Sequence, residues 1–271
     1  MRKELDAGGL LYVDLLKKAL TNWIHGHEEF IKVDLAPRKA YFAKWILPEN
    51  TFLVKPQKFD EKKRESGLDW PGMAHTMIGL KRLSNIQFCI EQVIKNDVPG
   101  DFIETGVWRG GGVIFMRGML KALSVTDRLV WAADSFEGLP KPDPEKYPAD
   151  LDDPHYKIDY LRVSLEAVKE NFSAYGLLDN QVKFLKGWFK DTLPQAPIDK
   201  LAILRLDGDM YESTMDALKS LYPKLSTGGY VIVDDYSIVN CAKAIHDFRG
   251  LHKINDEIID IDGVSAFWKK T

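Results

Sequence analysis

Residues 101–112 read DFIETGVWRGGG, in which a short apolar run leads into a glycine-rich turn. The run predicts a β-strand over Asp101–Glu104, and the stretch that follows the turn predicts a helix over Gly111–Leu123. Glycine lets the backbone approach a ligand closely and leaves amide groups free to donate hydrogen bonds. A strand, a glycine turn and a helix in this order indicate an α/β fold with a ligand-binding loop at the end of the strand.

Short apolar runs and helical stretches alternate from this point to the C-terminus. The predicted strands are Asp101–Glu104, Arg128–Ala133, Val182–Lys186, Leu201–Leu206, Tyr230–Val233, Glu257–Asp260 and Ala266–Lys269. The further predicted helices are Tyr160–Tyr175, Ser213–Leu221 and Ala242–Arg249. Such alternation is typical of a parallel sheet with helices on both faces, in which ligands bind at the carboxyl ends of the strands.

The residues before this pattern predict helices rather than strands. Apolar residues between Leu11 and Ile24 share one helical face, and a second helix is predicted over about Met73–Asn96. The polar, lysine-rich stretch Lys55–Ser66 predicts a loop. We therefore divide the chain into an N-terminal helical segment that helps to cover the site, residues 1–95, and an α/β domain, residues 96–271.

Composition excludes several classes of protein and partner. The 271 residues include 37 basic and 40 acidic ones, a net charge of −3 that gives no reason to expect nucleic acid as a partner. No apolar run approaches the roughly 20 residues of a membrane-spanning helix. Cys89 and Cys241 are far apart, which argues against a disulfide framework and fits the cytoplasm. Exposed apolar residues in the N-terminal helices lead us to expect a homo-oligomer.

The glycine turn has a spacing that favours S-adenosyl-L-methionine (SAM) over a dinucleotide. Its pattern is Gly-x-x-x-Gly-Gly-Gly from Gly106 onward, and not the Gly-x-Gly-x-x-Gly of dinucleotide-binding folds. Glu104 stands at the end of the strand, where a carboxylate would repel phosphate and attract an ammonium or sulfonium group. SAM carries both of these groups and no phosphate. The alternative is an ordinary tight turn between a strand and a helix.

The second predicted strand supports a nucleoside site. It ends in Asp134, and an acidic residue at this position accepts hydrogen bonds from ribose hydroxyls in nucleoside-binding folds. The alternative is an Asp that caps the turn formed by residues 134–138. Trp188 follows another strand end and could flank an adenine ring, although packing in the core is an equal alternative.

Four carboxylates follow two consecutive buried strands: Asp207, Asp209, Asp234 and Asp235. If uncompensated, these groups would repel one another at one edge of the sheet, and a divalent cation would resolve the repulsion. Oxygen ligands select a hard ion, of which Mg²⁺ fits best, with Ca²⁺ or Mn²⁺ as alternatives. Adjacent residues point oppositely in a regular strand, so the chain must turn at residues 234–235 if both are to bind. A carboxylate left free is a candidate base. The alternative is that each Asp caps a helix or turn.

Residues 141–157 interrupt the alternation with a segment rich in proline and acidic residues. A long loop within an α/β domain is often a lid or a substrate wall, and the alternative is a solvated surface insertion. The histidines lack metal-ligand spacing, and none of them, including His75 and His155 near these segments, is assigned a catalytic role.

Seven blocks of the chain form a recognisable series in a fixed order. They are Tyr12–Asn22, Asp69–Pro71, Ala74–Gly79, Glu104–Gly111, Asp134–Pro140, Leu206–Thr214 and Gly229–Tyr236. Together they resemble the macrocin O-methyltransferase (TylF-type) family of SAM- and Mg²⁺-dependent enzymes that methylate sugar hydroxyls of natural products. The resemblance covers nearly the whole chain.

The resemblance implies a role for each candidate site residue. The metal ligands would be Asp207, Asp234 and Asp235, and Asp209 would be the general base. The SAM loop would include Glu104 and Gly106, and Asp134, with Ser135 beside it, would bind the ribose. The resemblance also places Thr76 and Met77 on a helix that closes over the methionyl part of SAM. With Trp188, these residues form the predicted cofactor site.

The fold we therefore expect is a Rossmann-like class I SAM-dependent methyltransferase fold with an N-terminal helical segment. The expected acceptor is a glycosylated natural product of macrolide or aminocoumarin type. Mg²⁺ would chelate vicinal hydroxyls and lower the pKa of one, Asp209 would take its proton, and residues 141–157 would form a lid. The alternatives are a catechol-type O-methyltransferase acting on an aromatic diol and a non-catalytic SAM-binding module.

Overall fold

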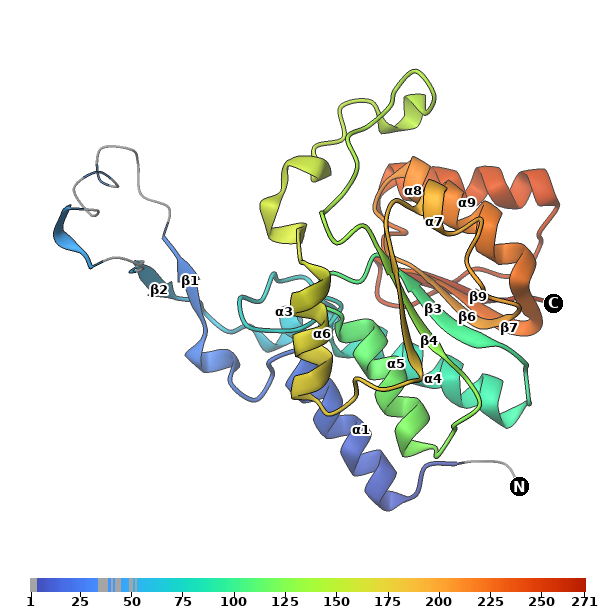
Figure 1. The fold of residues 1–271 in the computed structure, drawn as a ribbon, viewed down its shortest axis with the longest axis horizontal. Helices are drawn as coiled ribbons and strands as arrows, with labels where there is room; N and C mark the ends of the chain where they lie inside the picture. Colours follow the sequence, from blue (N-terminus) through green and yellow to red (C-terminus); the bar gives the residue numbers. More distant parts are fainter. Residues whose placement is uncertain (1–3, 34–38, 40, 42–44, 49–50, 52) are drawn as a thin grey trace.

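A twisted sheet of seven strands forms the centre of the molecule in the computed structural model, which describes residues 4–33, 39, 41, 45–48, 51 and 53–271 (Figure 1). Its strand order is β5-β4-β3-β6-β7-β9-β8. The first five of these are parallel, whereas β9 runs antiparallel to both β7 and β8. The strands are β3 Asp101–Thr105, β4 Val130–Asp134, β5 Val182–Lys186, β6 Leu201–Leu206, β7 Leu225–Val233, β8 Ile259–Asp260 and β9 Ala266–Lys269.

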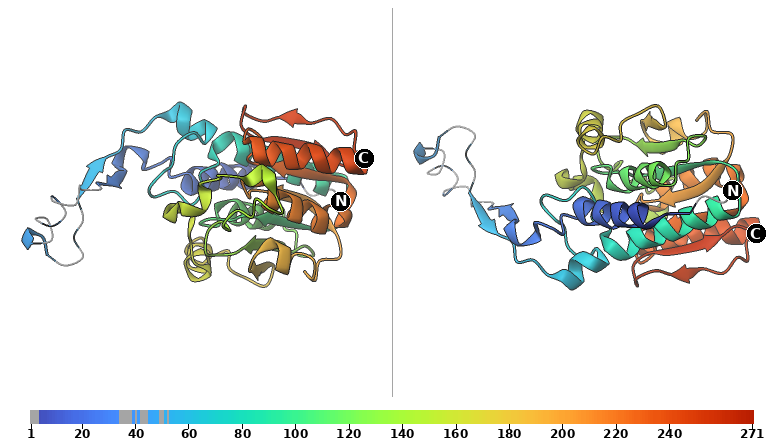
Figure 2. Two further views of the ribbon diagram at one scale, coloured as in Figure 1. Left: turned by 90° about the horizontal axis from the view of Figure 1, so that it is seen from above. Right: turned by 90° about the horizontal axis from the view of Figure 1, so that it is seen from below.

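Helices cover both faces of the sheet (Figures 1 and 2). One face carries α4 Gly79–Lys95, α5 Gly111–Ala122 and α6 Leu165–Ala174, with α1 Ala7–Leu20 packed against α5 and α4. The other face carries α7 Phe189–Thr192, α8 Tyr211–Leu221 and α9 Val239–His252. The predicted α/β architecture is therefore confirmed.

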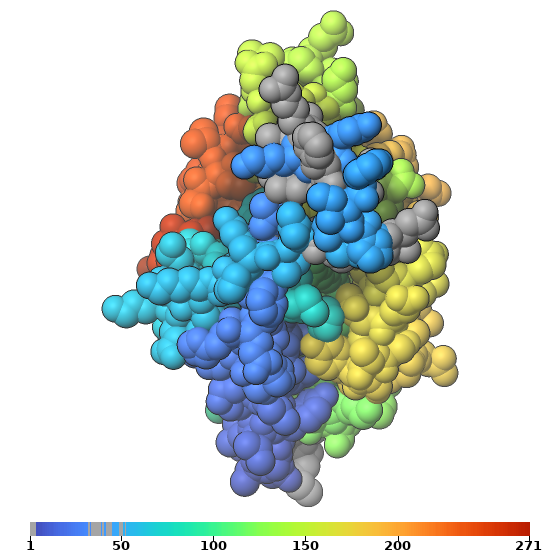
Figure 3. Space-filling model, turned by 90° about the vertical axis from the view of Figure 1, so that its left-hand side faces the viewer, coloured from blue at the N-terminus to red at the C-terminus, as the bar shows by residue number. Residues whose placement is uncertain are grey.

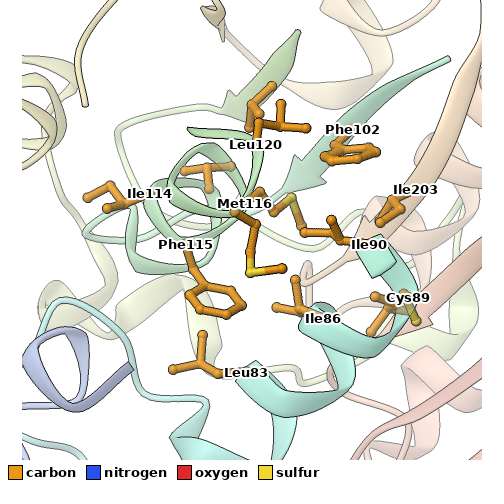
Figure 4. Close-up of a cluster of buried hydrophobic side chains, with 14 of the residues drawn as sticks. Leu83, Ile86, Cys89, Ile90, Phe102, Ile114, Phe115, Met116, Leu120 and Ile203 are labelled. Carbon is orange, nitrogen blue, oxygen red and sulfur yellow. The ribbon is translucent and has the colours of Figure 1, made fainter. Parts of the chain in front are cut away.

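The core lies in two layers because successive side chains of a strand point to opposite faces. Phe102 and Ile203 pack with residues of α4 and α5, among them Ile86 and Phe115, as Figure 4 shows. Their neighbours, such as Ile103, belong to the second layer under α8 and α9. Although α4 precedes the predicted domain boundary at residue 95, it supplies part of the first layer.

The strand predictions are confirmed, with β7 beginning earlier than expected and β8 shorter than expected. The helix predicted over Met73–Asn96 begins only at Gly79. The residues before it form turns and bends, and their backbone is bound by other segments. The N–H groups of His75 and Thr76 donate to the carbonyl oxygen of Leu20, and the carbonyl of His75 accepts from Gly111. Thr76 and Met77 thus precede the helix on which they were expected.

The prediction of a loop over Lys55–Ser66 was wrong. The structure has a strand, β2 Val54–Pro56, paired with β1 Phe30–Lys32, and a helix, α3 Glu61–Ser66. The helix is polar, but Asp60 caps its first turn and Arg64 anchors it from within. Arg64 is 2% exposed and forms ion pairs with Glu29 and Asp69, both at 2.7 Å. A buried ion pair of this kind leaves no apolar periodicity in the sequence.

The hairpin of β1 and β2 projects from the body as an arm (Figures 1 and 2). In the space-filling view of Figure 3 the arm lies in front, with the segment around residue 150 above it and α6 beside it. That segment forms 3₁₀ turns at Pro148–Asp150 and His155–Lys157. Further 3₁₀ turns are Gly26–Glu28, Asp159–Leu161 and Tyr222–Lys224. Among the residues described, no helix has both the length and the apolar character needed to cross a membrane.

Candidate active site

A cavity of about 300 Å³ opens at the carboxyl ends of β3, β4, β6 and β7, where an open α/β sheet binds its ligands. All the residues predicted to form the site line this one cavity. They are Thr76, Met77, Glu104, Gly106, Asp134, Ser135, Trp188, Asp207, Asp209, Asp234 and Asp235. The fold thus brings together residues from both predicted segments of the chain.

The glycines after β3 are required because neighbouring parts of the chain leave no space for a side chain at these positions. Gly106 has a φ of 86°, and a Cβ at this position would lie 1.6 Å from the carbonyl oxygen of Asp207. A Cβ on Gly112 would lie 2.3 Å from Oε1 of Glu104. Glycine at these positions therefore lets β3, the turn and the end of β6 approach closely enough to form the cavity.

Glu104 is held by one carboxylate oxygen and leaves the other without a partner. Its side chain is 3% exposed, and Oε1 accepts a hydrogen bond from Nη1 of Arg205. Oε2 is buried and has no hydrogen-bond partner among the described residues. Burial raises the pKa of Glu104 to about 7, and Arg205 opposes this shift. A cationic donor placed in the cavity beside Oε2 would satisfy this atom.

Asp134 caps the turn that follows β4, as the alternative to ribose binding expected. Its Oδ2 accepts from the N–H of Val107 and its Oδ1 from the N–H of Phe136, both at 2.7 Å. Ser135 donates to the carbonyl oxygen of Gly138 at 2.6 Å. A carboxylate oxygen has two lone pairs, so Asp134 can still accept from a hydroxyl in the cavity. The capping and ribose-binding interpretations are compatible in this geometry.

Three carboxylates cluster at the other end of the cavity. Asp207, Asp234 and Asp235 each offer one oxygen, and these oxygens all lie within 4.8 Å of one another. Burial raises the pKa of Asp207 and of Asp235 well above the ordinary value, and the neighbouring carboxylates raise both further. The negative charges of these carboxylates repel one another, and a hard divalent cation, which prefers oxygen ligands, would stabilise them.

The end of β7 allows both of its aspartates to reach the cluster. The strand ends at Val233, and the chain turns at once through Asp234 and Asp235. This is the turn that adjacent ligands require, since neighbours in a regular strand point to opposite faces.

Asp209 stands beside the cluster in a left-handed backbone conformation, with a φ of 56°. Its N–H donates to Oδ2 of Asp235 at 3.0 Å. Burial raises the pKa of Asp209 to about 6, and the nearby His155 opposes the shift. A carboxylate with a pKa near neutrality can accept a proton from a reacting group and release it again.

Two arginines, which the sequence interpretation missed, partly compensate the carboxylates. Arg205 is fully buried and donates to Glu104, to Asp207 and to Asp234. Arg82 donates to Oδ2 of Asp234 at 2.7 Å from its position on α4. The sequence interpretation considered only a cation as the compensating charge. A charged residue inside the apolar run of β6 was a visible signal for Arg205, whereas the helical pattern around Arg82 contained none.

His155, which was not assigned a role, lines the cavity. Its Nδ1 lies 2.7 Å from Oδ1 of Asp153, a side chain that is only 3% exposed. The segment that carries both residues is anchored further back, where the carboxylate of Asp150 accepts from the N–H groups of Tyr211 and Glu212 at the start of α8, both at 2.8 Å. These bonds hold the segment against α8, and His155 is the residue of 141–157 that lines the cavity.

An aromatic cluster borders the same cavity. Trp70 and Trp108 both line it, and Tyr160 contacts both rings, stacking on Trp70 with ring centroids 5.5 Å apart. Arg109 lies over Trp108, 4.3 Å from the ring centroid, and donates to two carbonyl oxygens of the segment before α4. Aromatic faces beside a polar cluster are typical of sites for small organic ligands.

Similarity to characterised proteins extends over nearly the whole chain. A 4'-O-methyltransferase from Streptomyces olivaceus that acts on 8-demethyl-8-(2,3-dimethoxy-alpha-L-rhamnosyl)-tetracenomycin-C is 51% identical over 96% of this chain and 93% of its own. The mycinamicin III 3''-O-methyltransferase of Micromonospora griseorubida is 48% identical over 98% of both chains. The demethyldecarbamoylnovobiocin O-methyltransferase of Streptomyces niveus is 48% identical over 99% of this chain and 97% of its own.

Solved structures agree with these similarities. The structure of the O-methyltransferase NovP superposes with a TM-score of 0.84 at 48% identity, over 97% of this chain and 99% of that one. The calicheamicin methyltransferase CalS11 shares the fold, with a TM-score of 0.57 at 17% identity over 88% and 95% of the two chains. The fold is that of the class I SAM methyltransferases. The family model of macrocin O-methyltransferase (TylF) matches residues 9–270, and the chain belongs to this family of O-methyltransferases.

Proposed function

We propose that the protein transfers a methyl group from SAM to a sugar hydroxyl of a glycosylated natural product, with Mg²⁺ as a second cofactor. One observation carries the proposal. The oxygen cluster of Asp207, Asp234 and Asp235 opens into the same cavity as Glu104 and Asp134. A cation site and a nucleoside site that share one cavity are what a metal-assisted methyl transfer requires.

The cofactor end of the cavity fits SAM in its charge and its hydrogen-bonding groups. The unpartnered Oε2 of Glu104 would accept from the ammonium group, and Asp134 would accept from the ribose hydroxyls. Thr76, Met77, Gly106 and Ser135 would enclose the cofactor, and Trp188 would lie against its adenine ring. SAM would supply an electrophilic methyl group on its sulfonium sulfur.

The metal end of the cavity fits a hard divalent cation, for which Asp207, Asp234 and Asp235 would provide the oxygen ligands. A cation there would lower the pKa of the acceptor's vicinal hydroxyls. Asp209 would then act as general base. The carboxylate of Asp209 would accept the hydroxyl proton as the acceptor oxygen forms its bond to the methyl group, and the sulfur of SAM would leave as a neutral thioether.

The acceptor is inferred from the relatives and from the cavity wall. The names of the three relatives refer to a rhamnosyl-tetracenomycin, a mycinamicin and a novobiocin derivative. The border of Trp70, Trp108 and Tyr160 would pack against the rings of such a molecule. We therefore propose an acceptor of macrolide or aminocoumarin type, whose sugar would contact His155 of the segment 141–157.

The proposal is tested by incubating the protein with SAM, Mg²⁺ and a panel of glycosylated macrolides and aminocoumarins. We expect one member of the panel to gain the mass of one methylene group. EDTA should abolish the gain and added Mg²⁺ should restore it. Methylation of catechol alone would instead identify the aromatic-diol enzyme. Binding of SAM without methylation of any acceptor across a broad panel would favour the binding module.

A further inference from the structure

Arg205 is the one side chain in the described part of the protein that donates to both ends of the proposed site. Its Nη1 donates to Oε1 of Glu104 and, over 2.7 Å, to Oδ2 of Asp207. Its Nη2 donates to Oδ1 of Asp234. The side chain is fully buried. One guanidinium group thus joins the carboxylate proposed for the cofactor to two of the three carboxylates proposed for the metal.

Sheet register explains how one side chain reaches all three. Arg205 lies on β6, opposite Glu104 of β3 on one side and opposite Ile232 of β7 on the other. Directly opposed residues share a face of the sheet, as do residues two apart in one strand. Glu104, Arg205 and Ile232 therefore start from the same face, with Arg205 on the central strand of the three. Asp207 and Asp234 follow directly where β6 and β7 end.

Each carboxylate keeps an oxygen or a lone pair available for a ligand. Oε2 of Glu104 has no partner among the described residues. Asp207 is 27% exposed at the cavity, and only its Oδ2 is bound to Arg205. Asp234 uses both oxygens, one for Arg205 and one for Arg82, but each oxygen has a second lone pair. Arg205 therefore holds the three carboxylates in place and leaves each of them able to accept from, or coordinate, a further ligand.

We propose that Arg205 is a positioning residue shared by the two sites, which orients Glu104 toward the ammonium group of SAM and Asp207 and Asp234 toward the cation. This inference rests on the proposed function. It assigns to one buried arginine the alignment of cofactor and metal, although this residue would contact neither.

Lysine cannot take over this role. Strands β3 and β7 flank β6 on opposite sides, so the backbones that carry Glu104 and Asp234 stand about 10 Å apart, twice the spacing of neighbouring strands. The two Nη atoms of arginine face the two sides in a rigid fork, whereas lysine offers a single compact ammonium group. Arg205→Lys keeps the charge and removes the bridge.

Binding of three probes tests the proposal: SAM, 5'-methylthioadenosine and Mn²⁺ as a spectroscopic substitute for Mg²⁺. 5'-Methylthioadenosine has the nucleoside of SAM and lacks its amino-acid part. We expect Arg205→Lys to weaken the binding of SAM and of Mn²⁺ by about tenfold to a hundredfold each, the range of a charge-assisted hydrogen bond. Affinity for 5'-methylthioadenosine should be unchanged, which a general loss of structure would not allow.

Arg82→Lys is the matched control. Arg82 contacts Asp234 but not Glu104, so this variant should weaken Mn²⁺ binding and leave SAM binding unchanged. Retention of both affinities in Arg205→Lys, or loss of only one, would overturn the shared role. If the parent protein binds neither SAM nor Mn²⁺, the proposed function itself fails.

If Arg205→Lys fails to bind 5'-methylthioadenosine, the variant has lost its fold. A second variant, Glu104→Gln, then tests the shared role of Arg205. Glu104→Gln replaces one of the three carboxylates that bind Arg205 with a neutral amide. The guanidinium group then interacts more strongly with Asp207 and Asp234 and competes with the metal ion for them. We expect this variant to weaken Mn²⁺ binding severalfold, although Glu104 is not a proposed metal ligand. Unchanged Mn²⁺ binding would overturn the proposal.

Discussion

The backbone N–H of Asp209 donates to Oδ2 of Asp235 over 3.0 Å, while Asp209 itself adopts a left-handed conformation. This bond connects the proposed base to a proposed metal ligand through the backbone of one and the side chain of the other. The side chains of Asp209 and Asp235 also contact each other, but the backbone bond does not depend on the carboxylate of Asp209. Aspartate and asparagine tolerate the left-handed region better than other non-glycine residues, so the position can be changed to Asn with little strain.

Asp209→Asn should lower the methylation rate by about 10²- to 10⁴-fold, the usual effect of losing a general base. Because the backbone bond to Asp235 is retained, Mn²⁺ affinity should fall only modestly, and SAM affinity should be unchanged. Steady-state kinetics and Mn²⁺ binding on the same variant test this. If saturating metal restores the rate, Asp209 acts on the metal and is not the base.

Asp235→Asn and Asp234→Asn should separate metal binding from stability. Both remove a proposed ligand and should weaken Mn²⁺ binding. In Asp235→Asn the amide oxygen can still accept from the N–H of Asp209, so the free energy of unfolding should change little. In Asp234→Asn an amide N–H₂ group would face Arg82 or Arg205, and breaking a buried ion pair costs about 3–5 kcal/mol.

Chemical denaturation and Mn²⁺ titration of these two variants provide the measurements. We expect equal losses of metal affinity and unequal losses of stability. Full Mn²⁺ affinity in Asp235→Asn would show that the cluster is not the metal site.

Much of the site could be predicted because a parallel sheet gathers the carboxyl ends of its strands at one edge. Glu104, Asp134, Asp207 and Asp234 each end or follow a strand whose apolar run is visible in the sequence, and the fold places them all on one cavity. Their convergence follows from the order of the strands and needs no knowledge of side-chain contacts.

The compensating groups could not be predicted in this way. Arg82 lies 152 residues before Asp234, and nothing in its helical pattern indicates which strand end it reaches. His155 reaches the cavity because Asp150 caps α8 and so holds the segment 141–157 in place. The sequence of this segment has no helical or strand periodicity from which that contact could be predicted. The start of α4 was misplaced for a similar reason, because hydrogen bonds to Leu20 and Gly111 hold the preceding residues outside the helix.

His155→Gln should raise the KM for the acceptor about three- to tenfold, the effect of losing one hydrogen bond. His155 lines the cavity, and Asp153 holds its Nδ1, which leaves Nε2 for a ligand. SAM affinity should not change. Asp153→Ala should have a similar effect because it removes the acceptor that orients the ring. His246, which pairs with Tyr236 and does not line the cavity, is the control position. Equal effects of His155→Gln and His246→Gln on KM would remove His155 from the acceptor site.

His75 should make the stability of the protein depend on pH. Burial lowers the pKa of His75 below its ordinary value of 6.5, and the charge of Arg109 lowers it further. Its Nδ1 lies 2.8 Å from the hydroxyl of Tyr175, and a neutral ring can accept a hydrogen bond there. Below pH 6.5 the unfolded chain therefore binds a proton at His75 that the folded protein does not bind.

The free energy of unfolding should consequently fall as pH decreases through 6.5 toward the lower pKa of the folded state, and this contribution should be fully present above pH 6.5. In His75→Asn the amide oxygen can still accept from Tyr175, but no group titrates at this position. Other groups also titrate in this range, so the quantity to compare is the difference between parent and variant in chemical denaturation from pH 8 to pH 5. We expect the parent to lose more stability than the variant on acidification. A difference that is the same at every pH would show that His75 has the same pKa in the folded and unfolded states.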